Sequence, residues 1–175
     1  MSERPAASPE PGLVLLDLYD EALPRVYGYL LSRSGDRSLA EDLTAETFAV
    51  ALDALRRDLA ITATIAWLTG IARHKLADHW RRQEREERGL RLVHGELADH
   101  EDPWDERIDA IRAREVLRGL GPHHRAALTL RYLDGLPVHD VAEHLGRTVG
   151  ATEALLVRAR VAFRSAYETE GSRHE

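Results

Sequence analysis

DVAEHLGRTVGATEALLVRARVAF, residues 140–163, has the pattern of two short helices joined at a glycine. Ala142 gives a small side chain where a second helix can cross the first, and Gly146, four residues later, tolerates the positive φ of a tight turn. The hydroxyl of Thr148 can cap the second helix. The stretch therefore predicts a helix-turn-helix, whose buried sides would consist of Val141, Leu145, Val149, Thr152 and Leu156.

The rest of the chain continues the helical pattern. Apolar residues recur at spacings of three and four almost throughout, and no stretch alternates long enough to predict a sheet. Pro24 interrupts the first stripe and is expected to kink or split that helix, and Ser38 with Glu41 forms a capping-box pattern at the start of the next. A third helix is predicted from about Thr64 to a stop at Gly89. The expected stripe of the first helix is Leu16, Tyr19, Leu23, Val26 and Leu30.

We therefore predict an all-α fold with two small helical domains joined by an acidic linker. The predicted domains cover residues 13–89 and 109–167, with the linker at 90–108 and tails at 1–12 and 168–175, the first of them disordered. The linker mixes acids, glycine and proline without sustained periodicity. Within residues 95–110 there are seven acidic residues and one arginine.

Composition excludes several classes of protein. The chain of 175 residues has no cysteine, which excludes disulfides, thiolate metal sites and thiol catalysis. It lacks both the apolar core of an export signal and a run of eighteen apolar residues, so we expect a cytoplasmic protein without membrane insertion. The net charge of −6 argues against a generic nucleic-acid coating protein, yet basic residues concentrate in residues 67–82 and 147–164.

The order of these segments resembles a known family. LGPHHRAALTLRYLDGLPVHDVAEHLGRTVGATEALLVRAR is similar to the C-terminal promoter-binding domain of bacterial sigma factors. Upstream, LYDEALPRVYGYLL, SLAEDLTAETFAVAL and WLTGIARHKLADHWRR resemble successive segments of the sigma-2 domain. The resemblance covers about residues 13 to 167 and points to the small two-domain class, the extracytoplasmic-function (ECF) sigma factors. It implies that core RNA polymerase and promoter DNA are the partners, that an anti-sigma factor is a further one, and that there is no catalysis or cofactor.

The resemblance also assigns roles to residues of the first domain. The AEDLTAETF segment corresponds to the surface that docks on core polymerase, which implies roles there for Asp42, Glu46 and Thr47. The acids at 42 and 46 lie one turn apart, an arrangement that a basic partner would favour. Without the resemblance, a solvated helix face is the preferred interpretation of this pair. The third helix corresponds to the segment that reads and opens the minus-ten element, and its expected contacts are Arg73, His74, Asp78, Arg81 and Arg82.

Two tryptophans and the linker leave alternatives open. We expect Trp67 to lie in the core, and for Trp80 core packing is favoured over stacking on an unpaired base. The resemblance implies that the acidic linker follows the RNA path of polymerase, and the alternative is a solvated spacer.

The second helix of the helix-turn-helix would read the minus-thirty-five element. Its expected contacts are Arg147, Thr148, Val149, Glu153, Val157, Arg158 and Arg160. Members of the family commonly place basic residues where this chain has Glu153 and Leu155, so the usual charged approach is missing. Glu153 could accept from a cytosine amino group, and the alternative is that it complements the positive end of the helix dipole.

Two other functions fit parts of the sequence. His139, Asp140, Glu143 and His144 form two pairs at spacing four, which can hold a metal on a helix, but no third ligand segment accompanies them. A metallohydrolase is therefore a remote alternative. A stand-alone helix-turn-helix regulator is the other alternative, and it leaves the basic third helix unexplained.

Overall fold

The computed structural model describes residues 11–58, 61–90 and 110–171. Within these ranges every regular element is helical, which confirms the predicted all-α fold. Residues 91–108 of the predicted acidic linker, the N-terminal tail up to residue 10 and the last four residues lie outside the described residues, whereas Leu90 is the last residue of α3. The chain forms two compact units that divide between Leu76 and Ala77, and each is described by itself.

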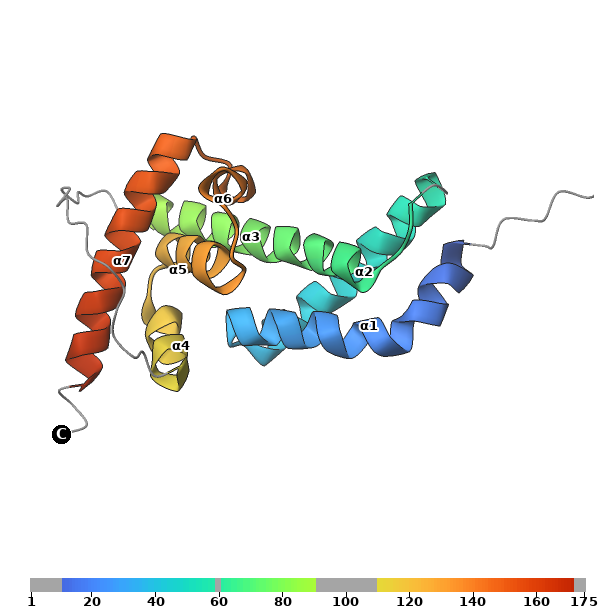
Figure 1. The fold of residues 1–175 in the computed structure, drawn as a ribbon, viewed down its shortest axis with the longest axis horizontal. Coiled ribbons are helices and arrows are strands. Elements are labelled where there is room, and N and C mark those ends of the chain that lie inside the picture. Colours follow the sequence, from blue (N-terminus) through green and yellow to red (C-terminus); the bar gives the residue numbers. More distant parts are fainter. Residues whose placement is uncertain (1–10, 59–60, 91–109, 172–175) are drawn as a thin grey trace, which may run out of the picture. The chain divides into compact units, whose positions relative to one another are not determined.

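Unit 1 contains α1 (Pro11–Ser34), α2 (Arg37–Arg57) and the first part of α3 (Ile65–Leu90). Helices α1 and α2 pack side by side (Figure 1). Helix α1 continues through Pro24, so the proline does not split it. Val26 and Leu30 are buried as predicted, whereas Leu16 is 64% exposed because the inward face at the start of α1 is formed by Leu15 and Ala22.

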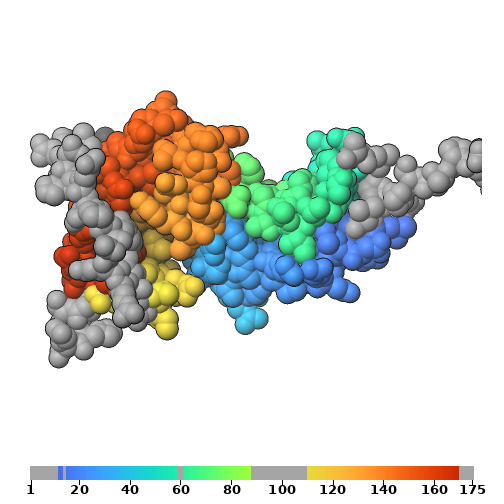
Figure 2. All heavy atoms as spheres, viewed as in Figure 1, coloured from blue at the N-terminus to red at the C-terminus, as the bar shows by residue number. Residues whose placement is uncertain are grey.

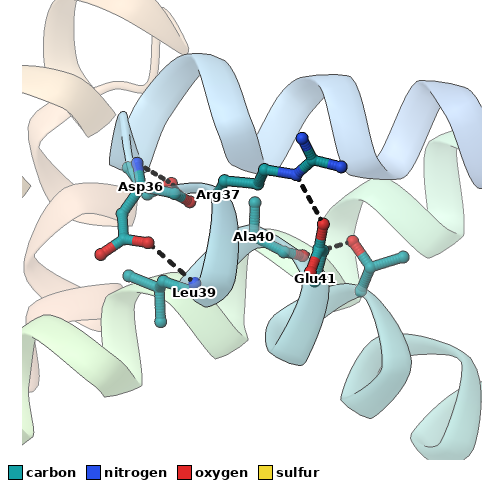
Figure 3. A network of polar contacts seen from close by, with 7 residues as sticks. Asp36, Arg37, Leu39, Ala40 and Glu41 are labelled. Atoms are coloured by element: carbon teal, nitrogen blue, oxygen red, sulfur yellow. Dashed lines mark hydrogen bonds and ion pairs between the residues drawn. The ribbon is translucent and has the colours of Figure 1, made fainter.

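The connection between α1 and α2 is a tight turn at Gly35, whose φ is 68°. Ser34 is buried there, and its hydroxyl donates to the Leu30 carbonyl at 2.8 Å. Asp36 then caps α2 by accepting from the Leu39 amide at 3.1 Å, and Arg37 pairs with Glu41 one turn on (Figure 3). The predicted capping box of Ser38 and Glu41 is therefore wrong, because α2 begins earlier than expected and Asp36 takes the capping position.

Unit 2 contains the remainder of α3 together with α4 (Ala110–Gly119), α5 (Pro122–Leu128), a π-helical turn η1 (Thr129–Leu133), α6 (Val138–Leu145) and α7 (Val149–Gly171). Helix α7 packs against α4, α5 and α6 (Figure 1). The core between α4, α5 and the middle of α7 consists of Val116, Leu120, Leu128, Ala159 and Phe163. This packing fixes the position of α7 within unit 2.

Two features define the structure of the segment between α4 and α6. Arg125 donates to the carbonyls of Leu117 and Leu120 at 3.1 Å each, and so satisfies acceptors at the end of α4. In η1 the amide of Asp134 donates five residues back, to the Thr129 carbonyl at 3.0 Å. A π-helical turn accommodates one residue more than an α-helical turn, and the turn at Gly135, with φ of 68°, follows at once.

Candidate nucleic-acid interface

Helices α6 and α7 form the predicted helix-turn-helix. Gly146 ends α6 in the left-handed region with φ of 61°, and the Arg147 amide donates to the Ala142 carbonyl at 2.9 Å. Thr148 caps α7 by accepting from the Ala151 amide at 3.2 Å. The roles predicted for Gly146 and Thr148 are confirmed. Four of the five residues that were expected to be buried are buried, namely Val141, Leu145, Thr152 and Leu156. The exception is Val149, which is 46% exposed because it lies on the outward side of the first turn of α7.

The outward side of α7 carries most of the residues expected at the minus-thirty-five element. Val149, Glu153, Val157 and Arg160 follow one another at spacings of four, four and three, which places them on one stripe of the helix. The first two are exposed and the other two partly exposed. Helices α5, α6 and α7 contact one another, and their atoms lie side by side in the space-filling view (Figure 2). Arg158, also partly exposed, lies on a neighbouring stripe.

Tyr132 is a residue of this surface that the sequence reasoning missed. It belongs to η1, its side chain is 44% exposed, and its hydroxyl accepts from Arg160 at 3.3 Å. The two residues are 28 positions apart, so no local spacing in the sequence indicates their contact. The hydrogen bond restrains the guanidinium of Arg160 on the outward side of α7.

Arg147 has a different environment from the other arginines of this region. It forms an ion pair with Glu84 of α3, and the two side chains are only 19% and 13% exposed. Leu155 lies nearby and is 1% exposed, as is Trp80 of α3. The apolar residue at position 155 is thus a buried packing residue, and it lines the same small space as Trp80. Trp80 takes the favoured core role. Trp67 is half-buried.

Helix α3 carries the residues expected at the minus-ten element across the division between the units. Arg73 and His74 belong to its unit 1 part, and Asp78, Arg81 and Arg82 to its unit 2 part. His74 and Arg82 are exposed, whereas the other three are partly exposed. Asp78 forms an ion pair with Arg81 one turn on, so the acid orients that guanidinium within the basic face.

Helix α2 carries the expected polymerase contacts. Asp42 and Glu46 are both exposed and lie one turn apart. Lys75 of α3 pairs with Glu46, with 3.1 Å between Nζ and Oε2, a contact that the sequence did not indicate. Thr47 is fully buried and its hydroxyl donates to the Leu43 carbonyl at 2.7 Å. A side chain with no exposed surface cannot contact a partner protein. The expected polymerase contact through Thr47 is therefore wrong, because this residue packs in the core.

His124 of α5 has a perturbed titration. Burial lowers its pKa to about 4, and the neighbouring His123 and Arg158 act in the same direction, while Glu84 opposes them. A histidine buried in its neutral form must be charged when the chain unfolds in acid.

The lowered pKa of His124 predicts an acid-sensitive fold. Between about pH 6.5 and 4 the unfolded chain binds a proton at this histidine and the folded chain does not, so the free energy of unfolding should fall as the pH falls through that window. Urea titrations at about pH 7.5, 6 and 5 measure this slope, because they begin above the ordinary pKa of histidine and descend through the window. His124→Asn should flatten it relative to His139→Asn, and equal slopes for both variants would contradict the prediction.

Two properties of the described residues bear on the alternatives. Within ranges 11–58, 61–90 and 110–171, no group of three His, Asp or Glu side chains is placed to hold a metal ion. His139 instead contacts Asp140, with 2.7 Å between Nε2 and Oδ1. Among the helices in those ranges, none combines the length and the hydrophobicity that a membrane span requires.

Comparisons with known proteins agree with the order of these surfaces along the chain. The family model of sigma-70 region 2 matches residues 18–86, and that of sigma-70 region 4 matches residues 111–163. The chain is 36% identical over 153 residues to the ECF RNA polymerase sigma factor BldN of Streptomyces coelicolor, an alignment that covers 81% of this chain and 56% of BldN.

Two further relatives extend the comparison. The chain is 36% identical over 131 residues to the ECF RNA polymerase sigma factor SigC of Mycobacterium tuberculosis, covering 73% of this chain and 70% of SigC. The sigma factor RpoE of Bartonella quintana, solved in complex with the anti-sigma factor NepR, shares the fold with a TM-score of 0.53 at 23% identity, over 87% of this chain and 95% of RpoE. With regions 2 and 4 matched in order and this identity to SigC, the chain belongs to the ECF branch of the sigma-70 family.

Proposed function

We propose that the protein directs bacterial core RNA polymerase to specific promoters and assists strand opening there. The observation that carries the proposal is the presence of two separate basic surfaces, one on α3 and one on a helix-turn-helix, in a chain that also has an acidic face on α2. A stand-alone regulator would need only the helix-turn-helix. In this role the protein acts in the cytoplasm, performs no chemistry and needs no cofactor.

We assign the separate functions of the protein to the segments that match the two family regions. We assign polymerase docking and the minus-ten element to residues 13–89, the minus-thirty-five element to residues 109–167, and the connection to the acidic linker 90–108. The matches to regions 2 and 4 support these bounds. Minus-ten contacts are assigned to Arg73, His74, Asp78, Arg81 and Arg82. An anti-sigma factor is a further proposed partner, in keeping with the complex in which the related RpoE was solved.

Transcription with purified components tests the proposal. Core polymerase is incubated with a library of promoter fragments, with and without this protein, and the transcripts are sequenced. The protein should produce transcripts that start at a defined distance from two shared upstream elements. Transcripts identical with and without it would refute the function, and tight sequence-specific duplex binding without polymerase would favour a stand-alone regulator.

Glu153 is proposed to read one base of the upstream element. Its exposed carboxylate lies on the outward stripe of α7, where it can accept from a cytosine amino group. A direct base contact contributes roughly 1 to 3 kcal/mol of discrimination, so Glu153→Ala should relax the preference at one upstream position and leave minus-ten selection unchanged. Promoter selection profiles measure both.

Arg158→Ala is the matched comparison for Glu153→Ala. An arginine that contacts phosphate carries no sequence information, so its removal should lower affinity evenly across sequences. If the Glu153→Ala profile coincides with that of the parent at every upstream position, the carboxylate acts only on the helix dipole, an effect of about 0.3 to 1 kcal/mol.

A further inference from the structure

Tyr132 stands on a firmly anchored part of unit 2. Its neighbours Thr129 and Leu130 in η1 are each 1% exposed, so the turn is rooted in the core. Two hydrogen bonds close the exit from η1: the Leu136 amide donates to the Leu130 carbonyl at 3.1 Å, and the Arg131 guanidinium donates to the Leu136 carbonyl at 2.8 Å. The backbone that bears Tyr132 is therefore fixed, although the side chain itself is 44% exposed.

The hydroxyl of Tyr132 holds a cation of α7. Arg160 donates to it from Nη1 at 3.3 Å, and this contact joins η1 to the outward stripe of the helix. An arginine side chain has many rotamers, and a side chain that is already held in place loses less rotamer entropy when it binds a ligand. A guanidinium has five N–H donors in a planar fork, so one bond to a phenol oxygen orients the fork and leaves donors for a ligand.

The place of Arg160 along α7 indicates which ligand it meets. A helix that reads the major groove contacts base edges with its amino-terminal residues. Arg160 follows Val149, the first residue of α7, by eleven positions, which is about 16 Å along the helix at a rise of 1.5 Å per residue. This distance exceeds the width of the major groove, which is about 12 Å. The guanidinium therefore lies where α7 leaves the groove, beside the phosphates of the DNA backbone.

We propose that Tyr132 is a positioning residue for promoter binding, which holds the guanidinium of Arg160 toward one DNA phosphate. The inference rests on the proposed function, since promoter DNA is the ligand. Tyr132 acts through Arg160 and reads no base, so it contributes affinity without sequence information. Loss of its hydroxyl should weaken binding equally for every sequence, and the effect should vanish once the guanidinium is gone, because the two side chains act as one unit.

The restraint on Arg160 can be measured in the free protein without DNA. Nuclear magnetic resonance relaxation of the Arg160 Nε–H group gives an order parameter for the guanidinium. Tyr132→Phe keeps the ring and removes only the acceptor, so this order parameter should fall toward the range below about 0.6 that marks a flexible group. Tyr19→Phe is the matched control, because it removes a similarly exposed tyrosine hydroxyl from α1. Equal order parameters in the parent and in Tyr132→Phe would overturn the proposal.

A double-mutant cycle measures the role in DNA binding, with holoenzyme and a promoter fragment recovered in the transcription experiment. Tyr132→Phe should weaken binding about fivefold, the cost of ordering one long side chain, whereas Tyr19→Phe should stay within about 1.5-fold of the parent. Arg160→Ala should weaken binding by more than about tenfold and lower the log–log salt slope by about 0.9, as the loss of one phosphate contact does. In the Arg160→Ala protein, Tyr132→Phe should have no further effect.

Additive losses for the two substitutions would overturn the positioning role, because Tyr132 would then act on DNA or on folding without Arg160. An unchanged salt slope for Arg160→Ala would overturn the phosphate contact. Failure of the proposed function gives a different result. A chain in which Tyr132→Phe loosens Arg160, yet which directs no transcription, keeps the restraint and refutes the sigma function. A chain that directs transcription but shows additive losses keeps the function and refutes the positioning role.

Discussion

Reversing the charges of Asp42 and Glu46 to lysine is expected to weaken binding to core polymerase by about a hundredfold, because like charges placed against each other across an interface cost several kcal/mol. Both carboxylates are exposed on one face of α2, so the exchange leaves the buried side of the helix intact. Binding of labelled protein to core polymerase measures the loss. Circular dichroism should show unchanged helical content.

The control for this reversal is Asp17→Lys with Asp20→Lys, two exposed acids on α1 that give the same change in net charge. It should bind polymerase nearly as tightly as the parent. Lys75→Met is a second test that Glu46 contacts polymerase. It removes the cation that pairs with Glu46 in the free protein, so that the Glu46 carboxylate is left to interact with polymerase alone. Equal polymerase affinity of the reversed and parent proteins would place the docking surface elsewhere.

Replacing Arg73, His74 and Arg81 by alanine should slow strand opening by about a hundredfold, since removing a charge-assisted hydrogen bond to nucleic acid costs roughly 1.5 to 3 kcal/mol. Fluorescence of 2-aminopurine placed in the minus-ten element follows opening. The dependence of promoter affinity on salt should also become weaker, because the log–log slope falls by about 0.7 for each single-strand phosphate that is no longer neutralised.

Arg114→Ala with Arg118→Ala removes two exposed cations of α4 and serves as the matched control for the α3 variant. It should open promoters at nearly the rate of the parent. Polymerase affinity of the α3 variant should stay close to that of the parent, because the α2 acids are untouched. A fall in polymerase binding in step with strand opening would show that α3 acts in docking rather than on DNA.

The turn of the helix-turn-helix could be predicted because its requirements are local. Only a residue that tolerates positive φ fits position 146, and a hydroxyl two residues on caps the helix that follows. The predicted start of the third helix at about Thr64 is confirmed, since α3 begins at Ile65 and the Thr64 hydroxyl accepts from the Trp67 amide at 3.1 Å, a cap that the sequence analysis did not name. The same local logic failed at Ser38, where two acceptable capping residues stand two positions apart and Asp36 takes the role.

The remaining surface depends on contacts between distant residues. Glu84 and Arg147 are 63 positions apart, and nothing in the spacing of either segment indicates that they meet. Leu155 was unexpected in a helix expected to enter a groove, and its burial beside Trp80 becomes evident only once α3 is placed. Likewise, Tyr132 of η1 and Arg160 of α7 are 28 positions apart, and no local spacing indicates their hydrogen bond. The periodicity of the sequence predicts which side chains of a helix are buried. It does not predict which other helix those buried side chains pack against.

The two-residue connection at Gly35 and Asp36 has a consequence for the order of events during synthesis. Helices α1 and α2 are adjacent in sequence and pack on each other, so their association closes only a very short loop. Such local pairings form rapidly, and segments made early by the ribosome fold before later ones emerge. The hairpin that bears Asp42 and Glu46 should therefore be assembled on the nascent chain while the helix-turn-helix has still to be translated.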